Sequence, residues 1–138
     1  MFSFYSKKQE LKYIGFEDIK QALSIPNDYL IINTLSENNQ DVLIKNTVSA
    51  EREEETVNKV IVQTQDLEPI FIIYGVNSCD KSVEKKYSQL VSLGFLKVYI
   101  YSGGLFEWLL LQDIYGEKEF PTTSKSSDLL KYRVKRCI

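Results

Sequence analysis

The residues best suited to chemistry lie in one short segment, 75–81, which reads Gly-Val-Asn-Ser-Cys-Asp-Lys. The segment follows an apolar run that predicts a buried strand, and it precedes a predicted helix. A loop in that position presents backbone N–H groups and the positive end of a helix dipole, so it favours a bound anion. The same field favours the thiolate form of a cysteine, which is its nucleophilic form. We therefore take Cys79 as the candidate catalytic residue.

The candidate binding residues surround Cys79 in the sequence. Lys81 and Lys85 add positive potential, and the amides of residues 77–82 would form a nest for an anion. Glycines follow two of the predicted strands, where they permit sharp turns and let the backbone approach a ligand. The predicted anion- or substrate-binding set is Gly75, Val76, Asn77, Ser78, Asp80, Lys81, Ser82, Lys85, Gly103 and Gly104.

The cysteine and histidine content limits the chemistry further. Two cysteines, Cys79 and Cys137, are too few for a disulfide framework, and we expect both to be free thiols. The chain has no histidine, so it lacks the usual general base and the commonest metal ligand. We predict no metal site and no cofactor.

Charge and hydropathy limit the partners. The net charge is -2, from 17 basic and 19 acidic side chains, which gives little attraction to nucleic acid or anionic lipid. The longest apolar runs are far shorter than the ~20 residues of a membrane-spanning helix. The first residues place aromatic side chains before two lysines, unlike a secretory signal. We therefore expect a soluble cytoplasmic protein without a nucleic-acid or membrane partner.

The elements that must position the loop follow from the hydrophobic pattern, in which strand-like and helix-like segments alternate. Ser49 and Ser82 are predicted N-caps, and Gly94 and Gly116 are predicted helix ends. Strands are predicted at 11–14, 29–34, 42–48, 69–74 and 97–101, and helices at 16–23, after Ser49, after Ser82, at 105–115 and, shorter, at 128–132.

Two of these helices carry further expectations. In the helix after Ser49, the glutamates of 51–55 would form a solvated face, and Val57, Val60 and Ile61 the buried side. The helix at 105–115 is apolar nearly all round, which is typical of a buried helix. Its side chains Phe106, Trp108, Leu109 and Leu110 are predicted to pack on the sheet.

This alternation predicts an α/β fold with a mostly parallel central sheet and helices on both faces. We expect an extension at 1–10, one domain at 11–121 and a tail at 122–138. In such folds ligands bind beyond the carboxyl ends of the strands, which places a site at the loops after Thr34, Tyr74 and Tyr101.

The sequence resembles the rhodanese family of sulfurtransferases over most of residues 13–108. The resemblance rests on the order and spacing of several pieces, and it implies a single rhodanese-like domain. The matching pieces are Phe16-Glu17-Asp18-Ile19, the strand 30–35, the strand 69–74 with its loop, the helix ending Leu93-Gly94-Phe95, the strand 98–101 running into Ser102-Gly103-Gly104, and Trp108.

The resemblance implies a mechanism. In that family a cysteine directly after the strand accepts a sulfane sulfur as a persulfide, loop amides cradle it, and arginine or lysine binds the anionic donor. Here Gly75 directly follows Tyr74, Cys79 lies four residues later, and the stretch up to Gly94 is about two residues longer than the usual pattern.

Other positions depart from the family in the same region. The Asp and Arg often found at the end of the second strand are replaced by Asn33 and Leu35. Related phosphatases with this fold have a cysteine and an arginine separated by five residues, and Cys79 has Lys85 at that spacing. Lysine cannot make the bidentate contact that arginine makes with a phosphoryl group.

Two hypotheses follow. In the first, Cys79 accepts sulfur from a small sulfur-containing anion such as thiosulfate, held by the amides of 77–82 with Lys81 and Lys85. In the second, the chain is a catalytically inactive rhodanese-like module that binds a protein partner or a small anion through the same loop and the Gly103-Gly104 turn.

Overall fold

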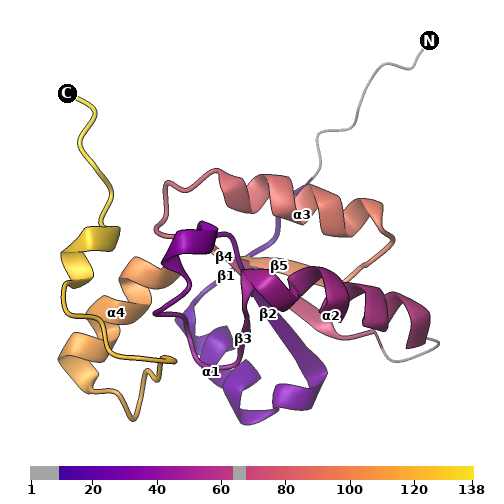
Figure 1. Ribbon diagram of the computed structural model, residues 1–138, viewed down its shortest axis with the longest axis horizontal. Helices are drawn as coiled ribbons and strands as arrows, with labels where there is room; N and C mark the ends of the chain where they lie inside the picture. Colours follow the sequence, from indigo (N-terminus) through magenta and orange to yellow (C-terminus); the bar gives the residue numbers. More distant parts are fainter. Residues whose placement is uncertain (1–9, 64–67) are drawn as a thin grey trace.

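The computed structural model describes residues 10–63 and 68–138, so the predicted extension at 1–10 lies outside the described residues except for Glu10. Within these residues the chain forms a five-stranded sheet in the order β1-β5-β4-β2-β3. Every neighbouring pair of strands is parallel. The strand β4 lies at the centre of the sheet, and its carboxyl end leads into the loop 75–81 (Figure 1).

None of the helices in the described residues is long and apolar enough to cross a membrane.

The strands alternate with helices along the chain, as the hydrophobic pattern predicts. In chain order the elements are β1 (Tyr13–Ile14), α1 (Phe16–Ser24), η1 (Pro26–Asp28), β2 (Tyr29–Asn33), η2 (Glu37–Asn39), β3 (Thr47–Val48), α2 (Ala50–Gln63), β4 (Ile70–Tyr74), α3 (Ser82–Ser92), β5 (Val98–Tyr101), α4 (Gly104–Tyr115) and η3 (Leu129–Tyr132).

The two faces of the sheet carry separate cores. On one face α1 and α4 cover the sheet, with Ile19 and Trp108 packed against Ile72 and Tyr74. On the other face α2 and α3 cover it, with Val57 and the α3 residues Tyr87 and Leu90 packed against Phe71 and Ile73. Alternate side chains of β4 therefore enter opposite cores, as expected for a strand buried on both faces. The predicted α/β class and the helices on both faces are confirmed.

The predicted strand at 42–48 is wrong in extent. Only Thr47 and Val48 form β3, whereas residues 42–44 are buried in the core of α1 and α4. The amide of Ile44 donates to the Tyr74 hydroxyl at 3.0 Å, and Ile44 forms an isolated antiparallel bridge with Thr122. The apolar run is buried by tertiary contacts with the C-terminal segment and with a side chain of β4, not by a strand ladder.

Three local predictions are also corrected. Ile61 in α2 is 46% exposed, because the buried face of that helix is narrow and contains Val57. Leu110 in α4 is 37% exposed, so one side of this apolar helix faces outward. Ser82 is the first residue of α3 and not its cap; its amide donates to the Asp80 carboxylate at 3.0 Å.

The segment after α4 returns to the body of the molecule. The amide of Lys45 donates to the Pro121 carbonyl, and the amide of Thr123 donates to the Leu43 carbonyl. A single turn, η3, follows, and Tyr132 at its end is 5% exposed. The region predicted as a tail thus carries a docked 3-10 turn before its exposed last residues.

Candidate functional site

The candidate site is the loop 75–81, which connects the central strand β4 to α3. At the same edge of the sheet, Thr34 follows β2 and Ser102 follows β5. The Ser82 hydroxyl contacts the Thr34 hydroxyl at 2.7 Å, which ties the start of α3 to the end of β2. This is the edge at which α/β folds bind ligands.

The centre of the loop is occupied by the side chain of Asp80. One carboxylate oxygen, Oδ2, accepts the amide of Val76 at 2.9 Å. The other, Oδ1, accepts the amide of Ser82 at 3.0 Å and the Ser82 hydroxyl at 2.6 Å. A carboxylate of the chain itself therefore takes hydrogen bonds that a bound anion would take.

Gly75 makes room for this carboxylate. A Cβ atom at residue 75 would lie 2.5 Å from Asp80 Oδ2, so any larger residue would displace the aspartate. Residue 75 is the position that the family resemblance assigns to the sulfur-accepting cysteine. The Asp80 carboxylate thus lies where the side chain of such a cysteine would begin.

Asn77 forms a second side-chain turn in the loop and also holds the C-terminal segment. Its Oδ1 accepts the amide of Cys79 at 2.9 Å, and its backbone carbonyl accepts the amide of Asp80 at 3.2 Å. Its Nδ2 donates to the carbonyls of Tyr132 and Arg133 at 3.0 and 3.2 Å. Three of the amides predicted to form the anion nest, those of residues 79, 80 and 82, therefore donate within the loop.

Gly104 packs closely against the backbone of the loop, whereas a Cβ at Gly103 would meet the side chain of Glu107. The first amides of α4, those of Leu105 and Phe106, donate to the carbonyls of Gly75 and Val76 at 2.9 Å each. Gly104 has a φ of +69°, and a Cβ there would lie 2.9 Å from backbone atoms of the loop. Two of the N-terminal amides of α4, which lack partners within the helix, are thus satisfied by loop carbonyls.

Cys79 is exposed and lines a cavity of about 200 Å³ with Lys81, Tyr13 and Ser102. Lys85 lines a different cavity, of about 400 Å³, between α2 and α3. The structure therefore brings Lys81 to the same cavity as Cys79 and places Lys85 at another. The catalytic and binding roles assigned to these residues stay predictions.

Two buried tyrosines, Tyr74 and Tyr101, end the strands β4 and β5 next to the site. Burial raises the pKa of Tyr74 well above its usual range, against the hydrogen bonds with Thr47 and Ile44. Burial raises the pKa of Tyr101 as well, and its hydrogen bond to Glu107 at 2.6 Å adds to that shift. Both phenols stay protonated at neutral pH and act as fixed hydrogen-bonding groups.

Asn33, at a position where the family often has aspartate, forms a closed amide network. It is 2% exposed and exchanges two hydrogen bonds with the Gln40 side chain, at 3.0 and 2.8 Å. It also accepts the amide of Leu35 at 3.0 Å and donates to the Val48 carbonyl at 3.2 Å. The end of β2 is therefore held by a structural network that contains no residue of the loop 75–81.

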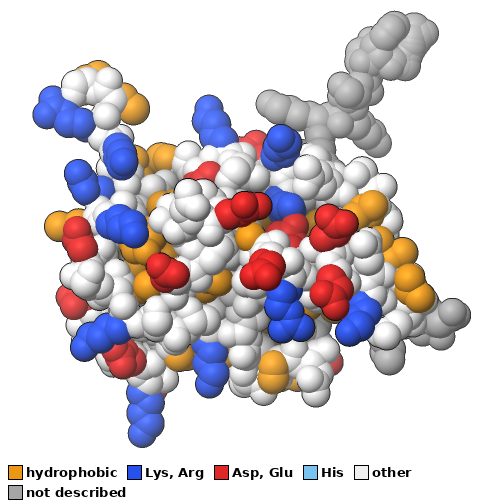
Figure 2. Space-filling view, in the orientation of Figure 1, with side chains coloured by type: hydrophobic (Ala, Val, Ile, Leu, Met, Phe, Trp, Pro, Cys, Tyr) orange, Lys and Arg blue, Asp and Glu red, His pale blue; other side chains and the backbone are white. Residues whose placement is uncertain are grey.

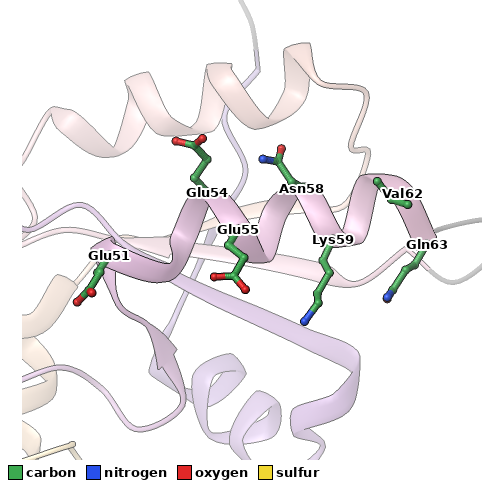
Figure 3. A pocket seen from close by; sticks show the side chains of 7 residues that line it. All are labelled: Glu51, Glu54, Glu55, Asn58, Lys59, Val62 and Gln63. Carbon is green, nitrogen blue, oxygen red and sulfur yellow. The ribbon is translucent and has the colours of Figure 1, made fainter.

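A larger hollow of about 670 Å³ runs along the exposed side of α2 (Figure 3). Figure 3 shows Glu54 and Asn58 directed toward one side of the helix and Glu55 and Lys59 toward the other. All the described residues that line it belong to this one helix. Glu51, Glu54 and Glu55 are exposed, as predicted for a solvated helix face, whereas Glu53 is mostly buried and forms an ion pair with Lys86 of α3.

Replacing Asp80 with asparagine tests its role as the acceptor of the loop. The change removes the charge and turns an NH₂ group toward an N–H donor, so we expect a loss of about 1–3 kcal/mol in the free energy of unfolding. Denaturant titration would measure the loss, with Asp113→Asn on the exposed side of α4 as the control. Equal stability of the two variants would contradict the role of Asp80.

Sequence reasoning did not identify several residues of the site. The loops after Thr34 and Tyr101 were predicted to lie at the site, but the predicted binding set did not include Thr34, Tyr13, Tyr101 and Ser102, which belong to or follow other strands. A sequence signal did exist for the closed loop: Asn77 and Asp80 each precede, by two residues, an amide that their side chain accepts. Asn and Asp form such turns frequently.

Comparison with known proteins relates this geometry to solved structures. No protein-family model matches the sequence, and no curated protein matches it. Among solved structures, the yeast protein Ygr203w, described as a tyrosine phosphatase of the rhodanese family, superposes with a TM-score of 0.61 at 14% identity; the match covers 92% of this chain and 100% of that one. The rhodanese-like domain of Alr3790 from Anabaena superposes with a TM-score of 0.53 at 20% identity, covering 94% and 95%.

A third similar structure is the As-Sb reductase from Leishmania major, with a TM-score of 0.55 at 18% identity and coverage of 78% of this chain and 81% of that one. At these identities the likeness concerns the course of the backbone and not the chemistry. The order of the parallel strands, the helices on both faces and the loop after the central strand agree with it. The chain has the fold of the rhodanese-like domains.

Proposed function

We propose that this chain is a catalytically inactive rhodanese-fold module that binds a protein partner at the edge of the sheet carrying the loop 75–81. The observation that carries the proposal is the Asp80 carboxylate, which accepts the Val76 amide at 2.9 Å beside Gly75. A negative charge at that place opposes the approach of an anionic sulfur donor. It also uses hydrogen-bond donors that a persulfide would need.

The first prediction from this proposal is that thiosulfate leaves the protein unmodified. Sulfur transfer would require a thiolate to attack the outer sulfur of thiosulfate, breaking its S–S bond and releasing sulfite. Cyanide would then take the sulfur as thiocyanate and restore the thiolate. We expect no mass gain of one sulfur atom and no thiocyanate above the rate without protein, with an active rhodanese as positive control.

The second candidate function is sulfur transfer through Cys79. The exposed thiol lines a cavity together with Lys81, which favours this alternative. Turnover that disappears in Cys79→Ser and persists in Cys137→Ser would contradict the inactive module and support this candidate. Turnover that persists in both variants would contradict both proposals.

A phosphatase function has less support. Cys79 and Lys85 have the spacing of a cysteine and an arginine in a phosphatase loop, but they line different cavities. We therefore propose no phosphoryl transfer for this chain. We further propose a cytoplasmic location, where the two free and exposed thiols would stay reduced.

A further inference from the structure

Charge is distributed unevenly along this chain. Residues 125–138 contain five basic and one acidic side chain, whereas residues 1–124 contain 12 basic and 18 acidic ones. The small net charge of -2 is thus the sum of a basic C-terminal segment, 125–138, and an acidic segment, 1–124. Figure 2 shows basic side chains gathered along the C-terminal segment and acidic ones over α2.

The basic segment is attached to the loop 75–81. Asn77 donates to the carbonyls of Tyr132 and Arg133, and the Tyr132 ring is buried in the core of α1 and α4. Asp128 accepts the amide of Leu130 at 3.1 Å and so begins η3. Figure 1 shows the C-terminal segment on the side of the molecule where the loop enters α3. Apart from Tyr132 and Leu129, which pack against the core, the side chains of residues 129–136 are exposed.

Those side chains combine positive charge with apolar surface. Lys131, Arg133 and Lys135 are exposed. Leu130, directly before Lys131, is 54% exposed, and Val134, between Arg133 and Lys135, is 45% exposed. Alternation of this kind suits a partner that supplies both carboxylates and apolar side chains.

We propose that residues 129–136, together with the loop that Asn77 ties to them, form a docking surface for an acidic segment of a protein partner. This inference rests on the proposed function and names the chemistry of the partner. Acidic side chains complement the exposed cations, and apolar side chains cover Leu130 and Val134.

The neighbouring surface favours a protein segment over a membrane or a nucleic acid. A cavity of about 240 Å³ next to η3 is lined by Asp113 and Glu117 together with Lys125 and Leu129. A flat anionic bilayer would meet these carboxylates as well as the cations, whereas a narrow peptide can avoid them. The Tyr132 ring is buried, so it offers no platform on which a base could stack.

Binding at this surface is coupled to the loop through one side chain. Asn77 holds the tail carbonyls with its Nδ2 and the amide of Cys79 with its Oδ1. A partner that shifts η3 must therefore change the surroundings of the Cys79 amide. We expect the NMR signals of residues 77–79 to shift when the segment is occupied.

The test is a selection of random displayed peptides on the full chain, followed by affinity measurement of the most enriched peptide. We expect enriched peptides rich in Asp and Glu with apolar residues between them. The triple variant Lys131→Glu, Lys135→Glu, Arg136→Glu should weaken binding by about tenfold or more. The matched control, Arg52→Glu, Lys59→Glu, Lys97→Glu, changes three exposed cations elsewhere and should keep the affinity.

Three results would overturn the docking surface: enriched peptides without acidic residues, equal weakening by both triple variants, or tighter tail-dependent binding to phosphatidylcholine vesicles containing phosphatidylserine or to single-stranded DNA. Circular dichroism would confirm that both triple variants fold. Failure here is distinct from failure of the proposed function, because sulfur transfer from thiosulfate is measured without the peptide.

Discussion

Replacing Trp108 with alanine is expected to lower the free energy of unfolding by about 3–5 kcal/mol. The indole is fully buried, and it packs edge-on against the rings of Tyr101 and Phe120, at centroid distances of 6.3 and 5.0 Å. Its Nε1 donates to the Pro121 carbonyl at 3.0 Å. Alanine would leave a cavity in the core and would remove one of the two hydrogen bonds to the Pro121 carbonyl, the other being donated by the Lys45 amide.

Two further variants make this prediction specific. Trp108→Phe keeps a ring and loses the N–H donor, so its loss should be smaller than that of alanine but measurable. Ile114→Ala changes a residue on the same helix that is 69% exposed, and it should alter stability by no more than about 0.5 kcal/mol. Similar denaturation midpoints for Trp108→Ala and Ile114→Ala would contradict the packing of α4.

The second large effect is expected for Gly104→Ala, at about 2 kcal/mol or more. Gly104 has a φ of +69°, a conformation that costs an L-residue about 1–2 kcal/mol. The added Cβ would also lie 2.9 Å from the Asn77 nitrogen and Cα and from the Gly75 carbonyl oxygen. Because those neighbours are backbone atoms, the loop itself must move.

Gly94→Ala is the matched control for this effect. Gly94 also has a positive φ, +101°, but a Cβ there would meet no atom within 4 Å. Gly94→Ala therefore tests the cost of a positive φ alone, without a steric clash between the new Cβ and the backbone. Amide spectra should show altered signals for residues 75–79 in Gly104→Ala and unaltered ones in Gly94→Ala. Identical loop spectra in both variants would contradict the close packing of α4 on the loop.

The backbone frame of the fold and the chemistry of the loop depend on different residues. The backbone elements that surround a rhodanese-type loop are all present, from the central strand to the helix α3. Within that frame Asp80 supplies the anion, and Asn77 connects the loop to the C-terminal segment. These two side chains hold the loop in its shape and connect it to the C-terminal segment.

Much of the fold could be predicted from hydrophobic pattern alone. The run at 69–74 becomes the central strand β4 because a short continuous apolar segment is stable only when both of its faces are covered. Gly94 and Gly116 end α3 and α4 at positive φ, which glycine adopts without steric cost. These features depend on near neighbours in the chain, so the sequence carries them directly.

The sequence-based predictions of secondary structure and burial were wrong where contacts with distant segments decide the structure. The apolar residues 42–44 carry a strand-like pattern, but the Tyr74 hydroxyl and the return of the chain at Thr122 bind their backbone instead. The outward side of α4 looked buried because a helix pattern cannot tell which of two apolar sides meets the sheet. The spacing of apolar residues predicts that a helix has an apolar face, but it does not predict which other element packs against that face.

The sequence by itself determined that a loop after a central strand would carry Cys79, with Gly75 in the place where the resembling family has its cysteine. Only the tertiary structure decided what fills that place. The Asp80 carboxylate occupies it because Gly75 has no side chain, and α4 and η3 press against the loop from segments far along the chain. Residue types and spacing predict where a site lies. Which side chain fills it depends on contacts that form only when the chain is folded.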